Sequence, residues 1–337
     1  MARENPTSMD VARHAGVSQS AVSRVFTPGA SVSIKMADKV KRSADALGYR
    51  PNVLARSLIT GQSRIIGLVV AYLDNQFYPE ALERLSMSLQ EQGYHVLVFM
   101  ASKTAGNIDQ VLEEILDYQV DGVIMASVAM SSNLAKRCDE AGIPVVLFNR
   151  RQSDVSFSSV TSDNVSGGYK LARFLIAGGH QRIGYIAGWD GASTQHDREA
   201  GFIRGLQEDG QTLFARECGN FVLEEARIAA RNMFSKSVMP DAVFVANDHM
   251  AFAVMDVLRF ELGLSVPDDV SVVGYDDVQL ASWTSYDLTT VRQPVNRMIS
   301  ETIAVLMARI EQGNSKLRNV ELDGALIVRG SARIQEG

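Results

Sequence analysis

The chain has 337 residues, a formal net charge of −6 and 46% hydrophobic residues, a composition typical of a globular protein with more than one domain. Its two cysteines, Cys138 and Cys218, form no CxxC pair, which argues against a disulfide framework or a zinc site. We find no apolar signal segment and no apolar run near the roughly 18 residues of a membrane span, so we expect a cytoplasmic protein. Nucleotide-binding and nucleophile-elbow motifs are absent from the sequence, and we expect no catalytic residue, no cofactor and no metal.

The charge is divided unevenly along the chain. Residues 1–64 carry ten Lys and Arg side chains against four acidic ones, a net charge of +6. The remaining residues carry 23 basic and 35 acidic side chains, a net charge of −12. A basic module joined to an acidic body indicates that one end contacts a polyanion, and nucleic-acid phosphates release counterions when Lys and Arg neutralise them.

The basic end has the pattern of a helix-turn-helix. Thr7 and Asp10 form a capping box that starts a first helix, and Gly16 ends it. Val17 follows as an apolar plug between helices, and Ser18 is a good N-cap for a second helix that runs to Phe26.

A third helix is predicted from Ser33 to Gly48, which suits a left-handed C-terminal cap. In a helix-turn-helix the second helix lies in the major groove with its first residues against base edges. This assigns base reading to Gln19 and Ser20, with Arg24 one turn later. Gln pairs with adenine and Arg with guanine, each contributing about 1–3 kcal/mol of discrimination.

The segments that identify a family lie in the helix-turn-helix and just after it. They are Asp10-Val11-Ala12, Ala15-Gly16-Val17-Ser18, Val22-Ser23-Arg24-Val25, Leu47-Gly48-Tyr49-Arg50-Pro51-Asn52 and Ala55-Arg56-Ser57-Leu58. With them the chain closely resembles the lactose/purine repressor (LacI/GalR) family of bacterial transcriptional regulators. The resemblance implies that the last segment is a hinge helix, which pairs with its dimer mate in the minor groove. There Leu58 would wedge into a base step and bend the DNA.

The predicted second helix and the resemblance together give a set of DNA-contacting residues. They are Thr7, Ser18, Gln19, Ser20, Ser23, Arg24, Tyr49, Asn52, Ala55, Arg56 and Leu58. One position departs from the family pattern, because Met36 replaces a polar residue usual near the start of the third helix and removes a phosphate contact.

From Arg64 onward the sequence alternates between apolar strands and helices. The strands are predicted at Ile65–Ala71, His95–Met100, Gly122–Ala126, Val145–Phe148, Ile183–Ala187, Ala242–Ala246, Val270–Tyr275 and Leu326–Val328. Helical stretches between them include Pro79–Gln92, Asn107–Tyr118, Tyr169–Ala177 and His249–Leu262. Continuous apolar strands separated by helices predict α/β lobes with parallel sheets buried on both faces.

The predicted lobes look like weak copies of each other. The stretch Asp121–Ser127 resembles Asp241–Asn247, and Ile143–Asn149 resembles Asp269–Asp276. Each stretch closes an apolar strand with a polar residue at its carboxyl end, where open α/β sheets bind ligands. Two facing lobes would therefore present Ser127, Asn149, Asn247 and Asp276 to one ligand.

The resemblance matches this picture, because the family has a periplasmic-binding-protein-like core with a small effector between its lobes. It implies three parts: a headpiece at residues 1–50, a hinge at 51–63, and a core at 64–337. We expect an N-lobe at about 64–162 and 293–322, and a C-lobe at about 163–292 and 323–337. The family positions for effector binding, together with the strand ends, give Asn75, Phe77, Ser127, Asn149, Arg150, Arg198, Phe221, Asn247, Asp276 and Gln293.

The effector is the least determined part of this hypothesis. Arg198 with Asn247 and Asp276 suits sugar hydroxyls, which both donate and accept hydrogen bonds. Asn149-Arg150 stands where many sugar-binding members begin with Asp, so a sugar acid or phosphorylated sugar is also to be tested. A purine corepressor is the alternative within the family.

We therefore predict a repressor of a carbohydrate-utilisation operon, with induction by the effector favoured over corepression. A solute-binding protein would need a signal peptide, and a sugar-processing enzyme would need an acid–base pair such as Asp163 with Asp276, which nothing in the sequence positions. The strand pattern near Gly337 leaves no room for a terminal heptad helix, so we expect a homodimer on a pseudo-palindromic operator of double-stranded DNA.

Overall fold

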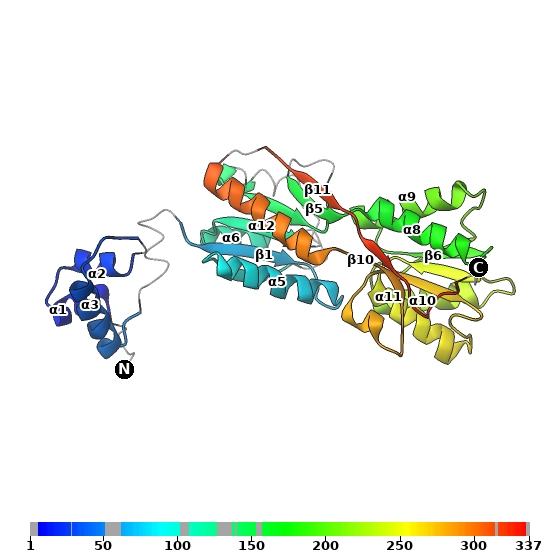
Figure 1. Cartoon of the computed structure of the whole chain (residues 1–337), viewed down its shortest axis with the longest axis horizontal. Helices are drawn as coiled ribbons and strands as arrows, with labels where there is room; N and C mark the ends of the chain where they lie inside the picture. Colours follow the sequence, from blue (N-terminus) through cyan, green and yellow to red (C-terminus); the bar gives the residue numbers. More distant parts are fainter. Residues whose placement is uncertain are drawn as a thin grey trace. The chain divides into compact units, whose positions relative to one another are not determined.

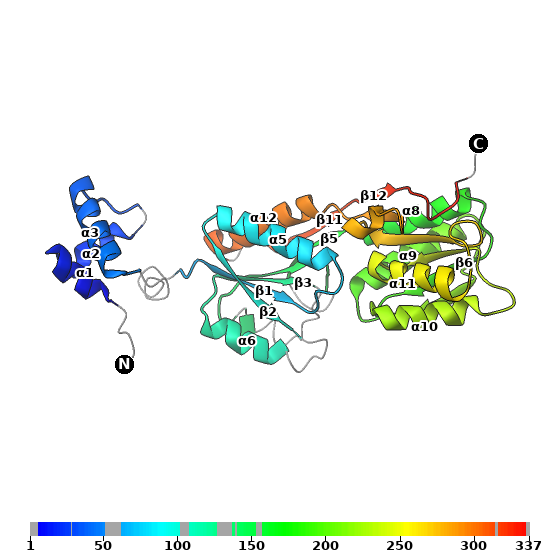
Figure 2. The same cartoon turned by 90° about the horizontal axis from the view of Figure 1, so that it is seen from below.

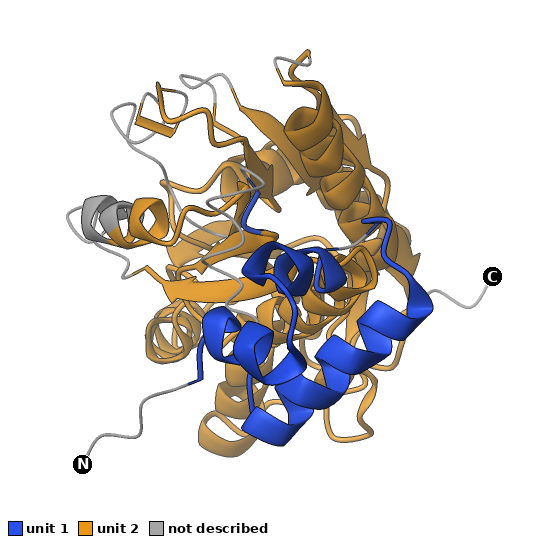
Figure 3. Ribbon diagram, turned by 90° about the vertical axis from the view of Figure 1, so that its left-hand side faces the viewer, with its two compact units in different colours: residues 1–63 blue, residues 64–337 orange. Residues whose placement is uncertain are grey.

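The computed structural model of the chain describes residues 6–27, 29–50, 62–101, 108–126, 137–138, 140–152, 157–313 and 316–334. The chain divides into two compact units, Met1–Ser63 and Arg64–Gly337 (Figure 3). The predicted hinge residues Asn52, Ala55, Arg56 and Leu58, and the predicted effector residue Ser127, lie outside the described residues. Within the described residues, no helix has both the length and the apolar character to cross a membrane.

The described part of the first unit contains three helices, α1 (Ser8–Ala15), α2 (Gln19–Val25) and α3 (Ile34–Leu47) (Figure 1). The predicted caps are confirmed: the Thr7 hydroxyl accepts from the Asp10 amide, and the Asp10 carboxylate accepts from the Thr7 amide. The Ser18 and Ser33 hydroxyls cap α2 and α3 in the same way. Gly16 and Gly48 end α1 and α3 at φ 56° and 67°, a left-handed conformation that glycine adopts without steric cost.

A small apolar core joins these helices. Val11, Val22 and Val40, one from each helix, are fully buried. Val17 packs against this core as predicted, and Met36 packs against it as well. Met36 therefore adds apolar contact to this core, and a core of a few residues depends on each such contact.

The second unit contains two six-stranded sheets. The N-lobe sheet has the order β11 (Asn319–Leu322), β5 (Ser158–Ser162), β4 (Val145–Phe148), β3 (Gly122–Ala126), β1 (Ile65–Val70), β2 (His95–Met100). The C-lobe sheet has the order β12 (Ala325–Ile327), β10 (Thr289–Arg292), β9 (Ser271–Asp276), β8 (Ala242–Val245), β6 (Ile183–Ala187), β7 (Ala215–Cys218). The repeats that resemble each other, β3 with β8 and β4 with β9, occupy equivalent places in the two sheets.

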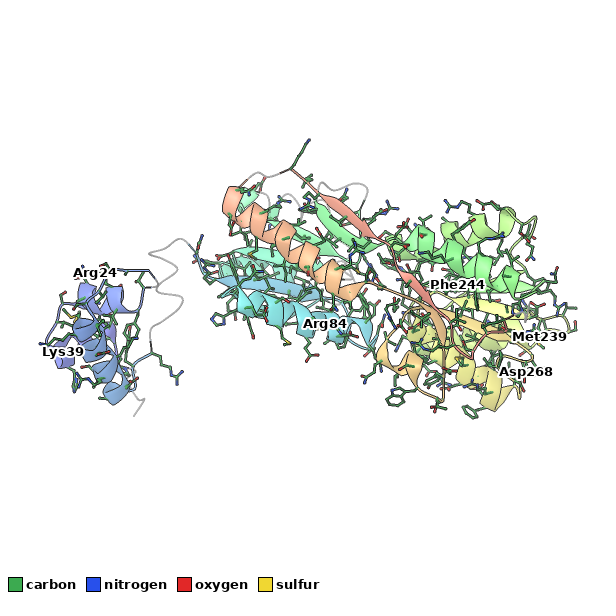
Figure 4. All side chains as sticks on the ribbon, in the orientation of Figure 1. Arg24, Lys39, Arg84, Met239, Phe244 and Asp268 are labelled. Atoms are coloured by element: carbon green, nitrogen blue, oxygen red, sulfur yellow. The ribbon has the colours of Figure 1, made fainter. Side chains whose placement is uncertain are left out.

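Helices cover both faces of each sheet. In the N-lobe, α5 (Phe77–Glu91) and α12 (Val295–Gln312) lie on one face and α6 (Ile108–Asp117) on the other (Figure 2). In the C-lobe, α8 (Asn164–Ala177) and α9 (Ser193–Gln207) lie opposite α10 (Leu223–Phe234) and α11 (Asp248–Asp256), with Phe244 of β8 fully buried between the layers (Figures 1 and 4). The chain passes between the lobes three times: from β5 to α8, from β10 to α12, and from β11 to β12.

The predicted strands are all present, but the sequence pattern missed β5, β7, β10 and β11. In β5 and β10 the reason is chemical, because these strands are rich in Ser and Thr yet completely buried or nearly so. Their hydroxyls are satisfied by residues distant in the sequence: Ser159 donates to Asn319, and Thr289 donates to the Arg329 carbonyl. The expectation of purely parallel sheets is wrong for one pair, since β10 and β12 run antiparallel.

Two glycines let α8 and α9 approach each other closely. A Cβ at Gly168 would lie 2.1 Å from the Arg198 carbonyl oxygen, and one at Gly201 would lie 2.0 Å from the Val165 carbonyl oxygen. Both obstacles are backbone atoms of a packed helix, which cannot rotate away. The helix that carries Arg198 is therefore held at a distance that only glycine permits.

We expect Gly168→Ala to lower the free energy of unfolding of the core by about 1–3 kcal/mol, the usual cost of overpacking. Helix propensity alone predicts the opposite, a gain of about 1 kcal/mol. Urea unfolding followed by circular dichroism measures the sign, with Gln207→Ala on the exposed face of α9 as the control. A stabilised Gly168→Ala protein would contradict the close contact.

Candidate nucleic-acid interface and interlobe site

One face of α2 is open to solvent and carries the predicted base-reading residues. Gln19, Ser20, Ser23 and Arg24 are all exposed, and Arg24 projects from its helix in Figure 4. Other exposed basic side chains of the unit are Arg13, Lys35, Lys39, Lys41, Arg42 and Arg50. A polar helix start flanked by cations can meet base edges with its tip and phosphates with its surroundings.

The remaining predicted contacts of this unit have structural bonds as well. The Gln19 amide nitrogen donates to the Ser8 hydroxyl at 3.0 Å, and the Ser18 and Ser20 hydroxyls lie 3.0 Å apart. Gln19 would have to release Ser8 to pair with adenine. Tyr49 is half-buried, with its ring centroid 6.0 Å from that of Phe26. Thr7 is exposed at the start of α1, where its hydroxyl donates to Asp10 at 2.7 Å and helps to hold the pKa of Asp10 below its usual value.

In the second unit, buried polar residues gather at the carboxyl ends of strands from both lobes. We call Asn75, Asn149, Arg150, Arg198, Asp276 and Gln293 the interlobe cluster, and all six are at most 7% exposed. Asn149 and Asp276 follow or end β4 and β9 at positive φ, 57° and 126°. Such strained backbone is concentrated at functional sites in proteins.

Asp276 is the centre of the interlobe cluster. Its Oδ1 accepts from Gln293 Nε2 at 2.7 Å and from Arg198 Nη2 at 3.2 Å. Its Oδ2 accepts from Asn75 Nδ2 at 3.3 Å, a bond that joins the C-lobe to the N-lobe. Burial raises the pKa of Asp276, whereas Arg198 and the amide donors lower it.

Arg198 is fixed by further partners in the C-lobe. Its Nε donates to Asn164 Oδ1 at 2.9 Å, its Nη1 donates to the Ala246 carbonyl at 2.5 Å, and its guanidinium carbon lies 3.7 Å from the Tyr275 ring centroid. The predicted residue Asn247 also has a structural role, because its Oδ1 caps α11 by accepting from the Met250 amide. Asn164 and Tyr275, which hold Arg198 here, are not among the effector residues that the sequence predicts.

The predicted aromatic residues Phe77 and Phe221 each pack within their own lobe. In the N-lobe, Phe77 stacks on Phe148 with centroids 6.2 Å apart. In the C-lobe, Phe221 rests on Gly188, where a Cβ would lie 2.1 Å from the ring. Trp189, which follows β6, was not predicted, although the rule that ligands meet strand carboxyl ends points to it.

Three buried polar atoms of the interlobe cluster have no hydrogen-bond partner among the described parts of the chain. They are Asn149 Oδ1, Arg150 Nε and Gln293 Oε1. Native proteins satisfy the great majority of buried polar atoms, so each exception calls for a reason. Since the three belong to one cluster between two lobes, a polar ligand that supplies their partners is the simplest reason.

A second carboxyl group lies behind Asp276. Asp248 is fully buried, accepts from the Thr290 hydroxyl at 2.7 Å and from the Val278 amide at 3.0 Å. Burial, together with the charge of Asp276, raises its pKa to about 7. Near neutral pH this pair of carboxyl groups therefore carries less than two negative charges.

Comparisons with known proteins agree with both units. Residues 7–52 match the model for bacterial regulatory proteins of the lacI family, and residues 172–332 match a periplasmic binding protein-like domain. The HTH-type transcriptional repressor PurR of Vibrio vulnificus is 31% identical and aligns over 97% of this chain and 98% of its own length. The ribose operon repressor of Escherichia coli is also 31% identical, over 97% and 99%. A structure of the Lac repressor dimer bound to operator and an anti-inducer is 26% identical, with a TM-score of 0.87 over 97% of this chain and 99% of the other.

The raised pKa of Asp248 gives a pH dependence of known sign. Between about pH 4 and pH 7 the folded protein keeps a proton that the unfolded chain, with a pKa near 3.8, has released. Stability therefore falls as the pH rises through this window, and the full penalty above pH 7 is on the order of 4 kcal/mol.

Asp248→Asn mimics the neutral acid. We expect its free energy of unfolding, relative to that of the wild type, to rise by about 2–3 kcal/mol from pH 5 to pH 8. Urea unfolding at both pH values measures the difference. Asp268→Asn, at an exposed position of the same lobe (Figure 4), controls for the loss of one carboxylate. Parallel pH profiles of Asp248→Asn and the wild type would refute the buried protonated acid.

Proposed function

The chain belongs to the lacI family of bacterial regulatory proteins, and we propose that it is a transcriptional repressor controlled by a small polar effector bound between the lobes of its core. The observation that supports an effector is the interlobe cluster, in which three buried polar atoms have no partner among the described residues. The exposed polar and basic face of α2 supports the assignment of the headpiece to operator DNA.

A homodimer on a pseudo-palindromic operator follows from the two-fold symmetry of such regulators. The Lac repressor relative was solved as a dimer on its operator. We propose that the hinge at 51–63, with Leu58 as its wedge, forms a helix only when two copies pair, because so short a helix is marginal alone. A change in lobe orientation on effector binding would alter the spacing of the two hinges and release the DNA.

The effector is proposed to be a carbohydrate that acts as inducer. Asn149 Oδ1 and Gln293 Oε1 supply acceptors for hydroxyls. Aromatic rings adjoin the cluster, with Phe148 directly before Asn149 and Trp189 beside Arg150, as in sites for polar ligands with apolar faces. The ribose operon repressor among the relatives supports a sugar, whereas PurR favours a purine as the second candidate. We propose no catalysis, so the effector should be recovered chemically unchanged after incubation with the protein.

We expect Arg24→Ala to weaken binding to the operator by about 1–3 kcal/mol, while binding to unrelated DNA changes little, because a base contact is lost. Fluorescence anisotropy at fixed salt, with an operator selected from random duplexes, measures both affinities. Lys41→Ala, an exposed cation on α3, should weaken both DNAs about equally. An equal loss on both DNAs for Arg24→Ala would contradict base reading.

In a panel of sugars, sugar acids, sugar phosphates and purines, we expect one class to raise the Tm of the protein. The same class should weaken operator binding, and the operator should weaken binding of that effector by the same factor. Phe221→Leu, which removes an aromatic wall, should weaken the Tm response at least tenfold in ligand concentration while leaving operator binding without effector intact. Binding of purines alone, with tighter operator binding, would replace the inducer hypothesis by corepression.

A further inference from the structure

Arg150 is a buried cation with no carboxylate partner among the residues that the structure describes. It is 7% exposed, its Nε has no hydrogen-bond partner, and no carboxylate oxygen of the described residues lies within 4.0 Å of its guanidinium nitrogens. Its neighbour Arg151 is about half exposed, yet it is paired with Asp197 at 3.1 Å through Nε. The two adjacent arginines thus reverse the usual rule that a buried charge is paired and a solvated one is free.

Arg150 belongs to the interlobe cluster and connects the two lobes. It follows β4 of the N-lobe, and its guanidinium carbon lies 5.5 Å from the ring centroid of Trp189, which follows β6 of the C-lobe. The charges of both Arg150 and Asp276 affect Tyr72, since Arg150 lowers the pKa of Tyr72 and Asp276 raises it. Arg150 and Asp276 therefore act on the same small volume.

The carboxylate of Asp276 does not neutralise Arg150. It already accepts from Arg198, Gln293 and Asn75, which occupy both of its oxygens. Arg198 and Arg150 then leave the cluster with one positive charge in excess. An uncompensated buried charge destabilises a protein, so such a charge is retained where a ligand completes it.

We propose that the effector is a polyhydroxylated anion whose carboxylate or phosphate pairs with Arg150. This inference rests on the proposed effector site and names its ligand class. Arg presents a planar fork that matches either anion in two parallel hydrogen bonds. Asn149 Oδ1 and Gln293 Oε1 are acceptors without donors, and they fit hydroxyl groups on the rest of the ligand.

Calorimetry with matched probes tests the ligand class. The panel is the aldonates, uronates and phosphates of the common pentoses and hexoses, each beside its neutral parent sugar. At least one anionic probe should bind the wild type at least tenfold more tightly than its parent. Carboxylate and phosphate probes compete within the panel, so the tighter class identifies the anion.

Arg150→Gln should weaken the best anionic probe by about 10-fold to 150-fold, the range of a charge-assisted hydrogen bond, and change the neutral parents by less than threefold. Arg173→Gln, which removes an exposed cation of α8, is the matched control and should change neither. The chain has two tryptophans, so Trp283→Phe leaves Trp189, beside Arg150, as the single tryptophan, which can be excited selectively over tyrosine. Its emission should respond to the anionic probe and lose that response with Arg150→Gln.

A measurement without ligand tests the charge itself. We expect Arg150→Met to raise the Tm of the ligand-free protein by about 2–4 °C, because it removes a buried charge and keeps an apolar chain of similar length. A lower Tm would show that Arg150 is compensated within the protein, which overturns the proposal.

The remaining outcomes separate this proposal from the proposed function. If neutral sugars bind as tightly as their acids and change operator affinity, the anionic effector is wrong and the regulator stands. If an anionic probe binds through Arg150 but never changes operator affinity, the ligand class stands and effector control is wrong. If no anionic probe of the panel binds, the anion proposal is overturned.

Discussion

The buried pair of Arg198 and Asp276 is the interaction on which the arrangement of the core depends. Arg198 ties α9 to α8 through Asn164 and to the end of β8 through the Ala246 carbonyl. Asp276 at the end of β9 ties the same guanidinium to Gln293 and, across the lobes, to Asn75. A buried ion pair of this kind contributes little net stability, but loss of either partner would leave a buried charge. Its effect is to fix the positions of α9 and of the ends of β8 and β9. The glycines at the α8–α9 contact allow α9, which carries Arg198, to approach α8 closely.

The two sheets have the same strand order, but their carboxyl ends are chemically different. In the C-lobe, Asp276 and Asp248 place two carboxyl groups close together, and Arg198 pairs with Asp276. In the N-lobe, the equivalent of β9 is β4, and it is followed by Asn149 and Arg150 instead of an acid. A site between the lobes is therefore acidic on one wall and basic on the other, which orients a ligand that has hydroxyls at one end and a negative charge at the other.

The headpiece follows a different physical logic, in which local bonds replace a large core. Its apolar cluster is small, so much of its definition comes from the caps of its three helices at Thr7, Ser18 and Ser33. The exposed face of α2 takes no part in the apolar core, and Gln19 on this face donates to Ser8. Side chains that carry little of the folding free energy are available for recognition.

The sequence by itself determined the helix-turn-helix, because caps and left-handed glycines act over three or four residues and are visible in order along the chain. It also determined most strands and the repeated lobes, since β3, β4, β8 and β9 are largely apolar and a polar residue ends or closely follows each of them. It also predicted Asp276 and Arg198 as site residues, the first from its place at a strand end and both from the family resemblance.

Tertiary structure alone decided that Ser- and Thr-rich β5 and β10 are buried strands, because their hydroxyls find partners far away in sequence. It alone decided that Arg150 lies over Trp189, with no carboxylate partner in the described residues, while Arg151 pairs with Asp197. Adjacent residues of the same type cannot be told apart by local pattern, and only the packing of distant segments determines which of the two loses its contact with water.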